Sequence, residues 1–165
     1  MYSGAAIIND EKWMRRALQL AKLAELTSEV PVGALIVKGE SLIGEGFNSP
    51  IKNHDPTAHA EIVALRQAAI RISNYRITGD TTLYVTLEPC TMCAGAIVHA
   101  RINRVVFAAH DLKTGAAGSV FSLLENDKNN HHLTVTGGVL EAEASEMIRQ
   151  FFRRRRQAKA NAKND

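Results

Sequence analysis

The chain has 165 residues, enough for one folded domain with its own core, and 45% are apolar and 22% charged, as in ordinary globular proteins. No apolar run approaches the roughly 20 residues that cross a bilayer, which excludes a membrane-spanning helix. The first residues lack the basic start of a secretory signal, so we expect a cytoplasmic protein.

The net charge of +3 is unevenly distributed. Residues 149–165 contain seven Lys or Arg and one Asp, a local charge of +6, so the rest of the chain carries −3. This asymmetry indicates either a polyanionic partner that meets the C-terminus or a solvated terminal helix. Charge by itself favours the solvated helix.

The predicted elements alternate between helix and strand. Helices are indicated by apolar residues three and four positions apart, and strands by short apolar runs between turn residues. In chain order they are a helix capped by Asp10 and ending near Leu26, strands at 32–37 and 41–46, a loop at 48–57, a helix at about 58–72, a strand at 81–86, a helix from Thr91 to about Ala100, a strand at 104–109, a long loop at 110–130, a weak strand at 133–136, and a basic helix at about 141–158.

The helix at 91–100 connects two predicted strands, which should therefore be parallel. We expect the α/β class: a three-layer α/β/α sandwich around a mixed sheet of about five strands. Without repeats or a linker, residues 1–165 are expected to form a single domain. The long loop at 110–130 is expected to line the functional site.

Cys90 and Cys93 are the only cysteines in the chain, and their C-x-x-C spacing fits either a redox pair or a metal pair. Three residues apart at the start of a predicted helix, their side chains point the same way. With His59 they make a set of two thiolates and one imidazole, which suits zinc. Three protein ligands leave a fourth position open to water, the pattern of a catalytic rather than a structural zinc site.

Glu61 follows His59 by two residues, so its carboxylate can lie beside a bound metal without binding it. A proton carrier for water is needed at that place. His59 alone would more often be an ordinary core or surface histidine. The combination His-x-Glu with Pro-Cys-x-x-Cys, here at 59–61 and 89–93, is an established signature of zinc-dependent nucleobase deaminases.

The sequence resembles the bacterial tRNA-specific adenosine deaminases, within the cytidine/deoxycytidylate deaminase superfamily, over nearly its whole length. The resemblance is carried by Glu29–Ala34, Gly44–Asn48, His54–Glu61, Leu83–Ala96, Lys113–Ser119 and Phe151–Arg153. The last two pieces are those typical of the branch that acts on tRNA. His110, Arg154 and Gly79 depart from the family pattern, and none of them touches the metal signature.

The resemblance implies hydrolytic deamination of adenosine to inosine at the wobble position (34) of tRNA anticodons, by a homodimer with one zinc per subunit. It implies that His59, Cys90 and Cys93 bind zinc and that Glu61 shuttles protons. For substrate binding it implies Asn48 near the sugar of the flipped nucleotide, and also Ala60. At the anticodon loop it implies Asp111, His131, Phe151, Phe152, Arg153 and Arg155.

Several of these residues, and the zinc site itself, also have simpler or different interpretations. Asn48 alone is typical of a turn, Asp111 of a strand-end cap, and helical periodicity indicates that one of Phe151 and Phe152 docks its helix on the sheet. The same zinc chemistry would serve a deaminase of a free nucleoside or base, which has no need of a cationic helix. A third alternative is an RNA-binding subunit with a structural zinc, which would have no use for Glu61.

Overall fold

A five-stranded mixed sheet forms the centre of the computed structural model, which describes residues 4–163. Its strand order is β2-β1-β3-β4-β5. The elements are α1 (Gly4–Leu26), β1 (Gly33–Lys38), β2 (Ser41–Phe47), α2 (Pro50–Asn53), α3 (Ala60–Arg71), β3 (Thr81–Leu87), α4 (Thr91–Ala100), β4 (Arg104–Ala109), β5 (Thr134–Thr136) and α5 (Glu141–Asn161). β1 is antiparallel to β2 and β3, whereas β3, β4 and β5 are parallel. The predicted mixed sheet and its parallel pair are confirmed.

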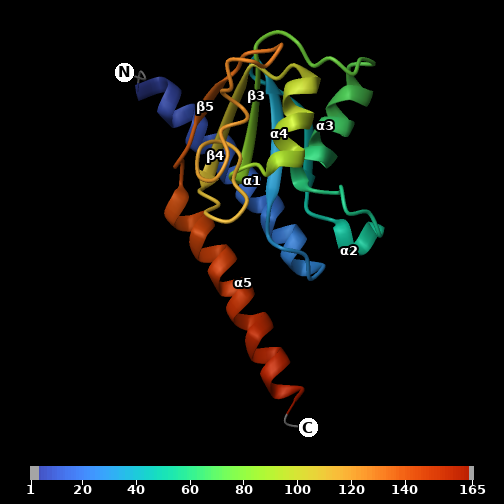
Figure 1. The fold of residues 1–165 in the computed structure, drawn as a ribbon, viewed down its shortest axis with the longest axis vertical. Coiled ribbons are helices and arrows are strands. Elements are labelled where there is room, and N and C mark those ends of the chain that lie inside the picture. Colours follow the sequence, from blue (N-terminus) through green and yellow to red (C-terminus); the bar gives the residue numbers. More distant parts are fainter. Residues whose placement is uncertain (1–3, 164–165) are drawn as a thin grey trace.

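Helices cover both faces of the sheet, as Figure 1 shows. Because side chains alternate along a strand, Ile36 and Leu83 pack against α3 and α4, and Leu35 and Tyr84 pack against α1 and α5. A strand buried on both faces is apolar at nearly every position, and this pattern holds for Ala34–Val37 in β1, Leu83–Val85 in β3 and Val105–Ala109 in β4. The three-layer α/β/α sandwich is the predicted one.

Two helices each approach a strand of the sheet so closely that only glycine fits on the strand at the point of contact. A Cβ atom on Gly33 would lie 2.1 Å from the carbonyl oxygen of Ala17 in α1, and one on Gly44 would lie 2.5 Å from that of Ala64 in α3. Backbone therefore packs directly on backbone. This contact sets the depth at which α3 lies on the sheet, and with it the position of His59 at the start of that helix.

The predicted start of the first helix at Asp10 is wrong. α1 begins at Gly4, and Asp10 is a buried residue in its interior. Its carboxylate accepts hydrogen bonds from the Tyr84 hydroxyl at 2.8 Å and from Arg104 at 2.8 and 2.7 Å. In the sequence, an aspartate before an apolar helical pattern looks like an N-cap. In the structure the Asp10 carboxylate instead binds side chains from β3 and β4.

Smaller differences concern element ends and loops. The predicted loop at 48–57 contains the short helix Pro50–Asn53, which begins with proline, a residue suited to the first turn. The weak strand shrinks to Thr134–Thr136, and the basic helix ends at Asn161 rather than near 158.

The C-terminal half of α5 extends away from the sheet (Figure 1). Phe151 is its last buried residue, and every residue from 152 to 163 is exposed. No helix within residues 4–163 is long and apolar enough to span a bilayer.

Candidate metal and nucleotide site

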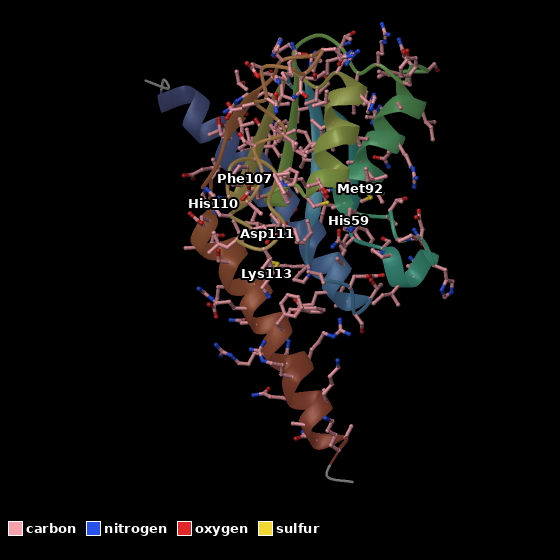
Figure 2. The ribbon with its side chains drawn as sticks, viewed as in Figure 1. His59, Met92, Phe107, His110, Asp111 and Lys113 are labelled. Atoms are coloured by element: carbon pink, nitrogen blue, oxygen red, sulfur yellow. The ribbon has the colours of Figure 1, made fainter. Side chains whose placement is uncertain are left out.

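The ends of two helices bring the predicted metal ligands together. His59 is the N-cap of α3, Cys90 is the N-cap of α4, and Cys93 lies in the first turn of α4. His59 Nδ1 lies 3.7 Å from Cys90 Sγ and 3.6 Å from Cys93 Sγ. Figure 2 shows His59 facing the start of α4, marked by Met92.

The three donor atoms fit a zinc ion. A tetrahedral ion with Zn–S bonds of about 2.3 Å and Zn–N bonds of about 2.0 Å holds nitrogen and sulfur about 3.6 Å apart. The observed distances of 3.6 and 3.7 Å match this separation, and all three donor atoms lie within 4.8 Å of one another. No disulfide joins the two cysteines, so both sulfurs are available as ligands.

The electrostatics of the cluster favour a thiolate. A hydrogen bond from Cys93, together with one from His59, overcomes the opposing effect of burial and lowers the pKa of Cys90 to about 4. Hydrogen bonding to Cys90 in turn raises the pKa of His59. Both residues are N-caps, where the partial positive charge of a helix end also favours an anion.

Glu61 lies in the first turn of α3 and is only 4% exposed. Burial raises the pKa of Glu61 to about 7, against smaller lowering effects from its own backbone amide and from His59. A carboxyl group that titrates near neutrality can both accept and release a proton at neutral pH. Glu61 lines the same pocket as His59 and Cys90, a cavity of about 210 Å³.

Asn48 and Asp111 also line this pocket, and each has a structural role as well. The side-chain oxygen of Asn48 accepts a hydrogen bond from the amide of Ala60 at 2.9 Å and so caps α3, leaving its NH2 group as the side-chain donor. The Asp111 carboxylate accepts bonds from the amides of Lys113 and Thr114 and from the Thr114 hydroxyl. Each side chain thus holds the local backbone and lines the pocket, and its role in substrate binding stays a prediction.

The metal pocket continues into a groove beside α5. The metal pocket shares four lining residues with a larger cavity: Val30, Leu87, Asp111 and Thr114. The larger cavity is also lined by Ile148, Arg149 and Phe152 of α5. The next hollow lies farther along α5 and is lined by Lys113 together with Arg149, Phe152, Arg153 and Arg156 of that helix. In Figure 2, Asp111 and Lys113 lie between His59 and the first turns of α5.

The two phenylalanines of α5 point in different directions. Phe151 is 5% exposed and docks the helix, whereas Phe152 is 40% exposed and lines the groove. Arg153 lies on the groove side with Phe152. Arg155 lies over the Phe151 ring, 5.6 Å from its centroid, and lines a separate hollow near α2. Of these four predicted contacts, the structure places Phe152 and Arg153 on the groove.

Two other predicted substrate contacts do not reach the pocket. His131 bonds through Nε2 to the carbonyl of Ile102, just beyond the C-terminal end of α4, whereas Cys90 and Cys93 lie at its N-terminal end. Ala60 is fully buried, and its amide is bonded to Asn48. Their roles in substrate binding stay predictions.

Glu88 is a residue of the site that the sequence interpretation missed. It lies two residues before Cys90, is 2% exposed, and lines the metal pocket. Burial raises the pKa of Glu88, but hydrogen bonds from Ser119, Asp111 and Ala117 outweigh that effect and hold it below the ordinary value. An acidic residue between the last strand residue, Leu87, and the Pro-Cys-x-x-Cys motif was the available signal.

The fold and the site together define a class of protein. An α/β/α sandwich presents one histidine and two cysteines at two helix N-termini, with a buried glutamate beside them. The family described as "Cytidine and deoxycytidylate deaminase zinc-binding region" matches residues 7–109, which contain all four of these residues. The class is that of the zinc-binding deaminases.

Comparison with individual proteins narrows the class. The chain is 57% identical to a tRNA-specific adenosine deaminase of Haemophilus influenzae, over 91% of this chain and 87% of that one. A structure from studies of A-to-I editing by tRNA:A34 deaminases aligns with a TM-score of 0.77 and 40% identity, covering 81% of this chain and 96% of that one. A guanine deaminase of Bacillus subtilis aligns with a TM-score of 0.59 and 39% identity, covering 68% and 71%. The chain belongs to the tRNA-specific adenosine deaminase family.

Proposed function

We propose that residues 1–165 form one zinc-dependent deaminase domain that converts adenosine to inosine at the wobble position (34) of tRNA anticodons. The observation that carries this proposal is the continuity of the metal pocket with the groove on α5. A small nucleoside would fill the pocket alone, whereas the groove adds an aromatic ring and several cations for neighbouring nucleotides.

In this proposal His59, Cys90 and Cys93 hold one zinc ion. Bound there, zinc supplies Lewis acidity that activates water near neutral pH. Glu61 takes a proton from the attacking water and delivers it to a ring nitrogen of adenine. It then moves the second water proton from the oxygen at C6 to the amino group, which leaves as the C–N bond breaks. Water oxygen replaces the amine at C6, so the products are inosine and ammonia.

The residues around the pocket position the nucleotide. The NH2 group of Asn48 is a donor at the pocket wall, fixed because the oxygen of the same amide caps α3. Asp111 and Thr114 form another part of the pocket wall, in a turn that the Asp111 carboxylate holds together. In this proposal a flipped adenosine lies in the pocket, and the bases on either side of it reach the groove.

The direct test uses an anticodon stem-loop RNA with adenosine at the wobble position. The zinc-loaded protein is expected to produce inosine there, read as an adenosine-to-guanosine change on sequencing. A matched RNA with the adenosine moved to the next anticodon position is expected to stay unmodified. Absence of inosine from the first RNA would contradict the proposal.

A second candidate, deamination of a free nucleoside or base, is favoured by the structural likeness to the guanine deaminase. The discriminating feature is α5. Truncation after Met147 removes Phe152 and the whole cationic stretch, and under the main proposal it abolishes activity on the RNA. Full activity of a folded, truncated protein on free guanine, cytidine or adenosine would favour the second candidate.

The protein is also proposed to act as a cytoplasmic homodimer. Ala96 and Val98 of α4 are only half-buried, and Val120 and Phe121 are exposed nearby in the chain, so apolar surface is available for a second copy. Two free thiols as metal ligands suit a reducing compartment. Light scattering is expected to give twice the chain mass of 18.0 kDa, and a monomer would contradict the dimer. Cell fractionation tests the location.

A further inference from the structure

Glu88 is a buried carboxylate whose hydrogen bonds all come from one segment. It accepts bonds from the backbone amides of Asp111 at 3.0 Å, Ala117 at 2.9 Å and Ser119 at 3.1 Å, and from the Ser119 hydroxyl. These four donors lie within residues 111–119, called here the wall segment. Both carboxylate oxygens accept hydrogen bonds. Because the donors lie at residue 111 and at residues 117 and 119, Glu88 holds the segment at both of its ends.

The middle of the wall segment is held against Pro89 and Cys90, which lie between β3 and α4. Ala116 donates its amide to the Pro89 carbonyl at 2.8 Å, and Gly115 pairs with Cys90 in an isolated β-bridge. A Cβ atom on Gly115 would lie 2.5 Å from the Glu88 carboxylate, so the segment wraps around that group with no space for a side chain. The carboxylate is therefore the centre about which the segment folds.

The wall segment contributes to both parts of the substrate-binding surface. Asp111 and Thr114 line the metal pocket, and Leu112 and Lys113 line the groove toward α5. All four lie between the amides that bond Glu88, those of Asp111 and Ala117, in a segment with no regular helix or strand of its own. A shift in this segment would move the pocket wall and the groove at once.

We propose that Glu88 is a positioning residue for the deamination: its carboxylate fixes the wall segment so that the nucleotide pocket and the groove for the adjoining RNA are held in register. The proposal rests on the proposed function. Glu88 itself need not touch the reacting atoms. Its effect passes through Asp111, Thr114 and Lys113.

The test is Glu88→Gln, which keeps the size of the side chain but replaces one acceptor oxygen with an NH2 group that faces amide donors. Hydrogen exchange at the amides of Asp111, Ala117 and Ser119 is expected to accelerate about tenfold or more, since each bond to a charged acceptor is lost or weakened. The amide of Ala94, bonded to the Cys90 carbonyl, should keep its protection. Bound zinc should stay at one ion per chain.

On the anticodon stem-loop, Glu88→Gln is expected to lower kcat/KM by about 10- to 100-fold, the usual effect of slight misplacement of positioning groups. Glu29→Gln is the matched control. Glu29 is also 2% exposed, but it accepts the amide of Lys52 in α2, so exchange in the wall segment should not change. Ser119→Ala removes a single donor and provides a milder second variant if Glu88→Gln does not fold.

Unchanged exchange at the three amides in Glu88→Gln, or in Ser119→Ala if Glu88→Gln does not fold, would overturn the proposal. Kinetic constants within about twofold of the wild type in Glu88→Gln would overturn it as well. So would loss of zinc together with loss of Ala94 protection, because Glu88 would then support the metal ligands instead. If the wild-type protein does not modify the RNA, the proposed function fails, while exchange at the three amides still decides whether Glu88 holds the wall segment.

Discussion

At the scale of single residues, the site depends on side chains that both hold the local backbone and line the pocket. The side-chain oxygen of Asn48 caps α3, and the Asp111 carboxylate closes its own turn. A residue held by the backbone in this way loses little conformational entropy when substrate binds, which favours a preorganised site.

Glu61→Gln tests the proposed proton carrier. The amide keeps the size of the side chain but cannot carry a proton between water and the adenine, so turnover should fall by at least about 10²- to 10⁴-fold. Zinc content should not change, because Glu61 is outside the cluster of His59, Cys90 and Cys93. The measurements are inosine formation and metal analysis of the same sample. A variant with nearly wild-type turnover would remove Glu61 from the mechanism.

At the scale of elements, close approach between α3 and β2 sets the position of the metal site. Gly44→Ala would place a methyl group 2.5 Å from the Ala64 carbonyl and 2.8 Å from Ala68. Overpacking of this kind costs about 1–3 kcal/mol. Urea denaturation should show this loss, whereas the control Ser41→Ala, at an exposed position of the same strand, should change stability by less than about 0.5 kcal/mol. Equal stabilities would show that α3 can move away from the sheet at little cost.

The cationic side of α5 is the other element that the function depends on. The double variant Arg153→Ala, Arg156→Ala should weaken binding of the stem-loop and reduce the slope of log Kd against log salt by about 0.7 per lost phosphate contact. Arg71→Ala, exposed at the far end of α3 from His59, is the control and should leave both quantities unchanged. An unchanged salt slope in the double variant would place the RNA elsewhere.

The order of the elements and the two-sided burial of the sheet could be predicted from the sequence, because apolar periodicity is a local property. The residue at which α1 begins could not be predicted in this way. Asp10 precedes an amphipathic pattern, as an N-cap does, but its partners Tyr84 and Arg104 are 74 and 94 residues away. Local pattern holds no information about partners at that separation.

At the scale of the whole molecule, the metal ligands connect the N-termini of two helices, α3 and α4. Removal of zinc with a chelator should therefore lower the melting temperature. The loss is about 2.7 kcal/mol if free zinc normally exceeds its Kd a hundredfold. Two thiols per chain should become reactive at the same time, since the chain has two cysteines. Restoring zinc should reverse both effects, and a melting temperature that does not respond to the chelator would contradict a linking role for the ion.

Stability should also fall in acid. A hydrogen bond from Thr57 lowers the pKa of Asp55, and in Asp111 bonds from Thr114 and Lys113 outweigh burial and lower the pKa as well. Because both folded-state pKa values lie below the ordinary value of 3.8, these groups stabilise the fold fully at pH values well above 3.8. That contribution disappears as the pH falls through the lower, folded-state values. Urea midpoints between neutral and acid pH measure the decline.

The variant Asp111→Asn has no carboxylate to protonate at that position, so its stability should decline less steeply in acid than that of the wild type. Asp127→Asn is the control. Asp127 lies in the same long loop, and within residues 4–163 its carboxylate accepts no hydrogen bond. Equal slopes for Asp111→Asn and the wild type would show that the turn at Asp111 does not depend on its charge.

The sequence by itself determined the metal ligands, the neighbouring Glu61 and the helix–strand order, since each depends on spacing within a few residues or on a short signature. Only the tertiary structure decided that Phe152 rather than Phe151 faces the groove, that His131 lies at the opposite end of α4 from the cysteines, and that Glu88 holds the wall segment. These three outcomes depend on how α5, α4 and the loop after β4 pack against the sheet. Packing of this kind joins residues far apart in the chain, and no local pattern records which of them will meet.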